Sequence, residues 1–317
     1  MVPVSSTLPE FGRLVTRLEG PLALELHRVD YWRHAQRIAI FVILYLGAAC
    51  SAVIVAGFSH WTLAIPCYLL AAASLHGISL FAHEAVHGTL APNHMGNRIF
   101  GALCAIPVLQ NCSAYRVLHL RHHRHLGEGG DPDHYANYTP WGWLIFVMNW
   151  ARLLIGYPIY IAAIPLLGFR QGNGRDRLGI GLELMATLVG GIVAVACVPA
   201  DWLWHGWFVP MLFINTMVNI RGMSQHTLLE HANDEVLGTR TILTTPLVRF
   251  FMCNENFHLE HHLYPAVPWY QLPHVHQALE PELRRRGAPY ISSYTAFVWE
   301  FLQFTMQPGP GASQPPA

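Results

Sequence analysis

Three short histidine clusters are the residues of this chain most able to do chemistry. They read His83-Glu84-Ala85-Val86-His87, His119-Leu120-Arg121-His122-His123 and His258-Leu259-Glu260-His261-His262. In a helix of 3.6 residues per turn, residues three and four positions apart lie on one face. Each cluster can therefore direct all its imidazoles at one point. Because histidine is the commonest ligand of transition metals, the spacing predicts a metal site built from eight histidines on three helices.

The number of imidazoles indicates more than one metal ion. Structural zinc takes four protein ligands and catalytic zinc usually takes three, so eight histidines exceed the needs of one zinc ion. Two ions with four or five ligands each would use them all. Imidazole binds iron, zinc, copper and nickel alike, so the clusters predict the number of metal ions better than their identity.

The composition places these clusters in a membrane protein. Apolar residues make up 52% of the 317-residue chain and charged residues only 12%, whereas soluble domains carry about 25% charged residues. Apolar runs long enough to cross a bilayer as helices, about 20 residues each, occur at 38–58, 61–81, 178–198 and 202–219. We therefore expect an all-α membrane protein with four transmembrane helices in two hairpins, interfacial helices and a histidine-rich cap.

Two further apolar stretches are interrupted or short. The stretch 141–169 contains Asn149, Arg152, Pro158 and Pro165, and we expect a bent or interfacial helix there because proline interrupts helical hydrogen bonding. The run 99–109 is too short to cross a bilayer and is expected in the interface or as a re-entrant segment.

The distribution of arginine predicts the orientation in the membrane. All nineteen basic residues are arginine, and cytoplasmic loops of membrane proteins are enriched in basic residues. With two hairpins, the only exported loops are the few residues around His60 and 199–201, and neither contains arginine. All three histidine clusters then lie on the cytoplasmic side. This pattern predicts a multi-pass integral protein of a bacterial inner membrane with a cytosolic metal site.

The first cluster also matches the H-E-x-x-H pattern of zinc metalloproteases, in which two histidines bind zinc and the glutamate is the general base. His83, Glu84 and His87 would take these roles. Since this interpretation leaves at least five clustered histidines without a function, a membrane zinc protease is a distant alternative. A membrane protein that stores or senses metal is a third, non-enzymatic alternative.

The order of the clusters resembles the three histidine boxes of the membrane fatty acid desaturase and hydroxylase superfamily. H-x-x-x-H, H-x-x-H-H and H-x-x-H-H follow one another within about 77–273, and NFHLEHHLYP at 256–265 with VPWY at 267–270 is similar to the third box of acyl-lipid desaturases and carotenoid oxygenases. The family also has a histidine in segments of the form R-x-x-x-x-H. Arg221 and His226 have that spacing, so the resemblance implies His226 as a ninth ligand, with His231 as a weaker candidate. The implied ligand set is His83, His87, His119, His122, His123, His226, His258, His261 and His262.

The resemblance implies two iron ions as cofactor and oxygen as co-substrate, acting on an unactivated C–H bond of a long-chain lipid. Fatty acyl desaturation is the activity we expect first. Hydroxylation or ketolation, including that of a carotenoid, and decarboxylation of a fatty acid to a terminal alkene are the alternatives. Motifs do not separate these reactions, because the outcome depends on sub-ångström placement of the substrate.

Carboxylates near the clusters are candidates for holding the histidines, because a metal-bound histidine usually donates its other ring N–H to a carboxylate, a carbonyl or water. Glu84 and Asp131 are the candidates we favour. The others close by in sequence are Asp133, Glu230, Asp234, Glu255 and Glu260. His125 is expected to point away from the ligand face and to hydrogen-bond. The histidines expected at the surface or in the interface are His94, His134, His274 and His276.

The expected partners follow from the missing redox motifs. The chain has no fingerprint of a haem, flavin, nicotinamide or iron–sulfur site, so electrons are expected from a separate carrier such as ferredoxin or rubredoxin with its reductase. The lipid bilayer and a long acyl or other apolar substrate complete the expected partners, and nucleic acid is not among them. We expect one membrane-embedded domain over 1–306, a disordered tail over 307–317 and no cleavable signal peptide.

Overall fold

The computed structural model describes residues 21–58, 61–134, 137–229, 233–234 and 236–306. This part of the chain is almost entirely helical. Its only strands are the two-residue β1 (Thr241–Ile242) and β2 (Tyr290–Ile291), which pair in parallel. The prediction of an all-α fold is confirmed.

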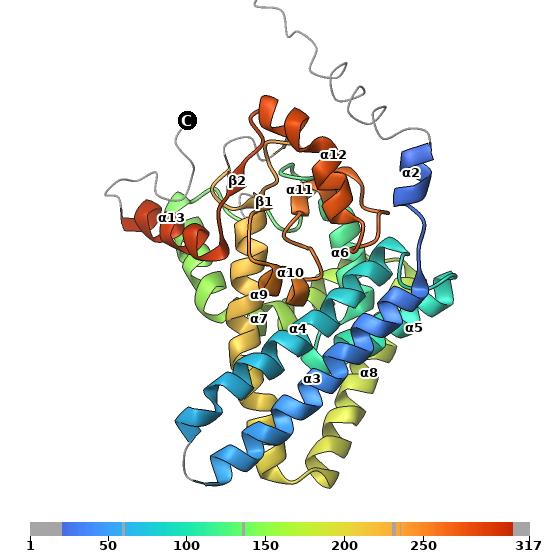
Figure 1. Ribbon diagram of the computed structural model, residues 1–317, viewed down its shortest axis with the longest axis vertical. Coiled ribbons are helices and arrows are strands. Elements are labelled where there is room, and N and C mark those ends of the chain that lie inside the picture. Colours follow the sequence, from blue (N-terminus) through green and yellow to red (C-terminus); the bar gives the residue numbers. More distant parts are fainter. Residues whose placement is uncertain (1–20, 59–60, 135–136, 230–232, 235, 307–317) are drawn as a thin grey trace, which may run out of the picture.

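Long helices form a bundle below a cap of shorter elements (Figure 1). After the short α2 (Pro21–Leu26), α3 (Tyr31–Gly57) leads away from the cap, and η1 (Trp61–Ala64) with α4 (Ile65–His87) leads back to it. Next, α8 (Gly174–Cys197) leads away and η4 (Trp202–Phe208) with α9 (Val209–His226) returns. The last residues of α3 and α8 and the first residues of η1 and η4 lie at the end opposite the cap, as two hairpins require.

Four helical stretches are long and apolar enough to cross a membrane: Leu22–Gly57, Thr62–His87, Gly142–Gln171 and Gly174–Cys197. Three of the expected spans lie almost entirely within them. The expected span 202–219 does not: it begins with the π-helical η4 and continues into α9, whose inward-facing Asn215 and Asn219 lower its hydropathy. The fourth stretch is instead α7 (Gly142–Gln171), which we expected to be bent or interfacial.

The expected bend in α7 is present, and its exposed backbone groups have partners. Ile155 has non-helical dihedral angles, and Pro158, three residues on, has no N–H for the carbonyl of Leu154. On α9, the Asn215 Nδ2 donates to that carbonyl at 2.9 Å and its Oδ1 accepts from Tyr157 N at 3.2 Å. The kink is therefore stabilised by α9, because an unpaired backbone group is costly in an apolar environment.

The cap consists of the shorter helices that follow α9 and the strand pair. It contains α10 (Pro246–Phe251), α11 (His258–Leu263), α12 (Leu272–Arg285) and α13 (Tyr294–Met306), whereas α5 (His94–Ala105), η2 (Ile106–Val108) and α6 (Cys112–Arg124) pack along the bundle helices α4, α7 and α8. The three histidine clusters lie at the end of α4, in α6 and in α11, so each is helical as predicted. His226 ends α9.

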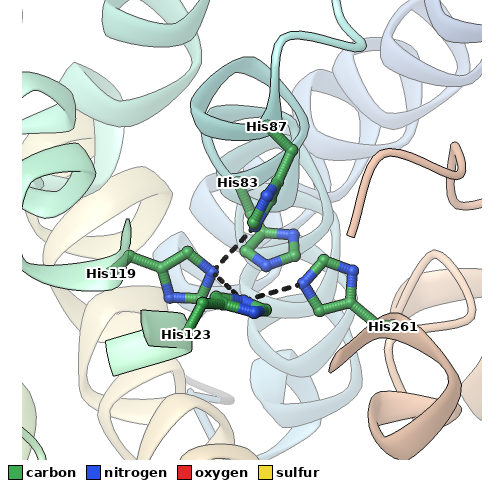
Figure 2. Close-up of side chains that lie close together, drawn as sticks. All are labelled: His83, His87, His119, His123 and His261. Atoms are coloured by element: carbon green, nitrogen blue, oxygen red, sulfur yellow. Dashed lines mark hydrogen bonds between the residues drawn. The ribbon is translucent and has the colours of Figure 1, made fainter. Parts of the chain in front are cut away.

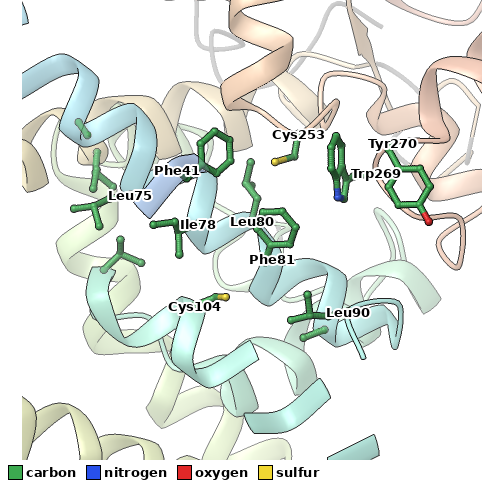
Figure 3. Packing of buried hydrophobic residues seen from close by; sticks show 14 of the residues in the cluster. Phe41, Leu75, Ile78, Leu80, Phe81, Leu90, Cys104, Cys253, Trp269 and Tyr270 are labelled. Atoms are coloured by element: carbon green, nitrogen blue, oxygen red, sulfur yellow. The ribbon is translucent and has the colours of Figure 1, made fainter. Parts of the chain in front are cut away.

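An apolar cluster fastens the cap to α3 and α4 (Figure 3). Phe41 and Phe81 from the bundle pack with Cys253, Trp269 and Tyr270 from the cap. α3 and α4 approach closely because position 77 is glycine: a Cβ there would lie 2.5 Å from the Phe41 ring. This packing holds the chain before and after the third histidine cluster against the end of α4.

Candidate metal centre

The helix that carries the second histidine cluster is anchored at its N-terminus. Asn111 caps α6 by accepting from Ala114 N, and the carboxylate of Glu183 on α8 accepts from the backbone N and the hydroxyl of Ser113. Carboxylates near a helix N-terminus are favourable because they pair with free N–H groups and the helix dipole. α8 therefore fixes the position from which α6 presents its histidines.

The nine predicted histidines gather in two groups. The five-histidine group is His83, His87, His119, His123 and His261, and the four-histidine group is His122, His226, His258 and His262. Figure 2 shows the five rings converging from α4, α6 and α11. The groups adjoin each other, since the rings of His123 and His262 stack with centroids 4.2 Å apart.

The distances between ring nitrogens fit a shared metal ligand shell. In the five-histidine group, the Nε2 atom of His119 lies 3.0 Å from that of His87 and 3.1 Å from that of His123. In the four-histidine group, the Nε2 atom of His258 lies 3.0 Å from that of His226 and 3.1 Å from that of His262. For metal–nitrogen bonds of about 2.1 Å, ligands are about 3.0 Å apart at a right angle and about 3.4 Å apart at the tetrahedral angle. These spacings favour more than four ligands per ion.

Burial favours the neutral form of most of these rings, which is the form that metal binding requires. His122 differs: although burial acts to lower its pKa, the hydrogen bond to Asp131 raises it. Burial, followed by the charge of neighbouring rings, lowers the pKa of His119, His261 and His262 well below the ordinary value. The pKa of His258 is lowered to about 4, mainly by burial. Neutral imidazoles have lone pairs available, and the all-nitrogen donor set suits iron as well as other transition metals.

Two carboxylates and one carbonyl face the Nδ1 atoms of histidines in both groups and so can fix the orientation of their rings. Asp131 Oδ1 accepts from His122 Nδ1 at 2.9 Å, and the carbonyl of Gly238 accepts from His226 Nδ1 at 3.0 Å. Glu255 is buried, with one oxygen 3.0 Å from His83 Nδ1 and the other 3.7 Å from His258 Nδ1. Glu255 therefore bridges the two groups. The sequence did not distinguish this residue from the other nearby carboxylates.

The electrostatics of these carboxylates match their positions. Burial by itself raises the pKa of Asp131, but the hydrogen bond and charge of His122 outweigh it and lower the pKa. Burial also acts against ionisation of Glu255, yet the charge of His83 and the nearby Nδ1 atom of His258 hold its pKa well below the ordinary value. Both side chains are ionised and can orient imidazoles.

Glu84 has a different position from the one we expected. Its carboxylate accepts from the Thr89 hydroxyl at 2.8 Å and from Trp269 N at 3.4 Å. Among the described residues, no hydrogen bond joins it to a ligand histidine. It lies near His83 and Glu255, so it supports the site through the packing of α4 against the cap.

The remaining predicted carboxylates and histidines that the structure describes lie outside the two groups, and several of them make other contacts. Glu260 pairs with His276 Nδ1 at 2.5 Å and with the Thr241 hydroxyl, so the expectation that His276 lies at the surface or in the interface was wrong. His125 belongs to neither group and lies 3.9 Å from Glu128. Asp133 lies 3.9 Å from His122 Nδ1 with an exposed side chain. Glu230 and His231 lie outside the described residues.

A cavity of about 370 Å³ adjoins both groups. Its wall includes His83 and His119 of the five-histidine group and His122, His226 and His258 of the four-histidine group. The kinked α7 supplies most of the opposite wall, where the side chains are largely apolar: Met148, Ala151, Ile159, Ala163, Ile164 and Leu167. The cavity can hold an apolar chain beside the two histidine groups.

Comparison with known proteins identifies the family. The model of the fatty acid desaturase family matches residues 59–294, about three quarters of the chain. This chain belongs to the fatty acid desaturase family. The zinc protease interpretation is not supported, because H-E-x-x-H here is the first of three desaturase boxes and its glutamate is turned to Thr89 and Trp269.

Characterised members of the desaturase family are similar over most of this chain. The sn-1 oleoyl-lipid 12-desaturase of Picosynechococcus sp. is 21% identical over 284 residues, which cover 83% of this chain and 80% of the relative. The dihydrorhizobitoxine desaturase of Bradyrhizobium elkanii is 29% identical over 74% of this chain and 71% of its own. The sphingolipid delta(4)-desaturase/C4-monooxygenase of Mus musculus is 24% identical over 72% of this chain and 68% of its own. By their names, these desaturases act on different substrates.

Proposed function

We propose that this protein is a membrane desaturase that uses oxygen and two iron ions to introduce a double bond into a long acyl chain. The observation that carries the proposal is the convergence of nine buried or partly buried histidines into two adjacent groups beside a largely apolar cavity. Lipid desaturases among the relatives support an acyl substrate. Iron bound to the two groups would supply the oxygen activation needed to remove hydrogen from an unactivated C–H bond.

The residues of the chain have distinct tasks in this proposal. The nine imidazoles hold the metal as neutral ligands, five for one iron and four for the other. Asp131 and Glu255 orient His122, His83 and His258 by accepting or facing their Nδ1–H groups. The wall of α7 keeps water out and places the acyl chain against the histidines. The protein thus positions substrate and ligands while the metal carries the oxidation.

The same proposal places the site on the cytoplasmic side of a bacterial inner membrane, with electrons supplied by a separate ferredoxin- or rubredoxin-like carrier. The arginine distribution supports this orientation. His87 and His123 of the five-histidine group and His226 of the four-histidine group are only partly buried, so neither group is sealed off from the protein surface.

Lipid analysis of cells that express the protein tests the activity. We expect wild type to produce, only in the presence of oxygen, an acyl product two mass units lighter than its precursor. His261→Ala should abolish this product. The matched control His274→Ala should retain it, because His274 is an exposed histidine on α12 outside both groups.

The same measurement separates the alternative reactions. One of the relatives is named a desaturase/C4-monooxygenase. A product sixteen mass units heavier than its precursor would show that this protein hydroxylates its substrate instead of desaturating it. Release of a terminal alkene would indicate decarboxylation. An unchanged lipid profile in wild type, with the carrier and its reductase supplied, would contradict the proposed function.

A further inference from the structure

The cavity follows the length of α6 and has a distinct wall at the end far from the cap. Its α6 side runs from Tyr115 through His119 to His122, and Gln110 lies just before the helix. Asp133 and Tyr138, both with exposed side chains, border the cavity near His122. From Cys112 to His119, seven residues of helix span about 10 Å. Gln110 is therefore about that far from the nearest histidine group along the helix.

A hydrogen bond between two side chains crosses this far end. Gln110 Nε2 donates to the Tyr160 hydroxyl of α7 at 3.1 Å, and both residues line the cavity. The Tyr160 ring also stacks on the ring of Tyr157, with centroids 6.0 Å apart. Ile164 and Leu167, on the same side of α7, give this end of the cavity an otherwise apolar surface.

The turn that presents Gln110 has an unfavourable backbone conformation. Leu109 has φ 62°, in the left-handed region, where a bulky residue without glycine's freedom is strained. Such conformations persist only where the surroundings fix them. Here Tyr157 donates to the carbonyl of Val108 at 2.8 Å, and Trp207 Nε1 donates to that of Pro107 at 2.8 Å. Three side chains from α7 and η4, including Tyr160, thus fix this turn.

We propose that the Gln110–Tyr160 pair is the end wall of the substrate cavity and sets which C–H bonds of an acyl chain reach the histidines. The inference rests on the proposed function, because it assigns substrate selection to the same site. The substrate class is a single acyl chain that enters with its methyl end first and stops at this wall. The distance from the wall to the histidines then fixes the number of carbons between the methyl end and the new double bond.

Removing a side chain from the end wall, which lengthens the cavity, tests this inference. Tyr160→Ala removes the ring and the hydrogen bond, so a chain can slide deeper and the double bond forms farther from the methyl end. With acyl chains that differ by two carbons, we expect the preference for the longer chain to rise by roughly tenfold or more, since one methylene in an apolar pocket is worth about that factor. Mass spectrometry gives both the preference and the position of the double bond.

The matched control is Leu166→Ala, which removes a similar apolar side chain from the exposed face of the same helix. It should leave the product distribution as in wild type. If Tyr160→Ala is not recovered as folded protein, Gln110→Ala opens the same wall and carries the test. A folded, iron-loaded Tyr160→Ala or Gln110→Ala variant with the wild-type chain preference and double-bond position would overturn the inference. Loss of all product in wild type would instead contradict the proposed function.

Discussion

Glu255 is the residue on which the two histidine groups most depend for their relative position. It is 2% exposed, and it faces His83 of one group, His258 of the other and Arg221 at 3.6 Å. Sequence alone could not select it among seven nearby carboxylates, because it lies before the third box and faces a histidine of the first. Cys253 and Asn254, both with positive φ, turn the chain just before it.

Replacing this carboxylate with its neutral isostere should weaken iron binding. We expect Glu255→Gln to lower the affinity for iron by about 10- to 100-fold, the usual cost of losing a group that holds a metal-bound histidine. Elemental analysis of purified protein after dialysis against a weak chelator measures this loss. Glu128→Gln, at a site 61% exposed near the second box, is the control that should retain iron. Equal iron retention in both variants would contradict the bridging role.

The histidines themselves could be predicted because their spacing is local. Residues three and four apart on one helix share a face whatever the tertiary structure, so eight were found from spacing and His226 from family resemblance. The division into five and four depends on how α4, α6, α9 and α11 meet. His119 and His122 lie on the same helix yet belong to different groups, which no local pattern indicates.

At the scale of the elements, α7 is a kinked helix whose bend depends on a partner. Its prolines predicted a bend, but the partners of the freed backbone groups are on α9, about sixty residues later. Position 156 must be glycine-like for this contact, since a Cβ there would lie 2.7 Å from Asn219 Oδ1. The same bend shapes the cavity wall.

Removing these partners should destabilise the bend. In Asn215→Leu, the Leu154 carbonyl and the Tyr157 N–H lose their side-chain partner, and we expect the free energy of unfolding to fall by about 1–3 kcal/mol for each backbone group left unpaired in the apolar environment of the bundle. Thermal unfolding in detergent measures the change. Thr216→Val, on the exposed side of α9, should have little effect, and equal stability of the two variants would argue against the role of Asn215.

At the scale of the whole molecule, the two histidine groups join the bundle to the cap, because their side chains come from α4, α6, α9 and α11. Composition and apolar runs predicted the bundle, and the helical spacing predicted the box helices, because both depend on short stretches of sequence. The length and hydropathy of the helices select α7 in place of the expected span 202–219, because α9 uses polar residues to hold α7 and so has lower hydropathy than a simple span. The strand pair and the anchoring of α6 by Glu183 depend on distant contacts and had no local signal.

Metal removal should loosen this junction. Without metal, neutral rings converge with their lone pairs toward one another, so we expect chelator-treated protein to unfold at a lower temperature than iron-loaded protein. A metal present at about 100 times its dissociation constant stabilises by about 2.7 kcal/mol. Scanning calorimetry or fluorescence of the two forms in the same detergent measures the difference. Identical unfolding temperatures would show that the histidine groups do not bind metal.

The metal-free protein should also lose stability as the pH falls. Burial lowers the pKa of His261 and His262 in the fold, whereas unfolded histidine titrates near about 6.5. Below about pH 6.5 the unfolded chain binds more protons than the folded chain, so the free energy of unfolding decreases, by up to about 1.4 kcal/mol per pH unit for each such histidine. Chelator-treated protein unfolded at several pH values tests this. Stability that does not fall between about pH 6.5 and 5 would contradict the burial of neutral rings.

The metal content of wild type and of one variant from each histidine group tests the central claim most directly. Elemental analysis of purified, detergent-solubilised protein should find about two irons per chain, one for each group. His261→Ala, from the five-histidine group, and His226→Ala, from the four-histidine group, should each lose about one iron, while His274→Ala keeps both. A single zinc ion in wild type, or full iron content in both group variants, would contradict the two-iron site.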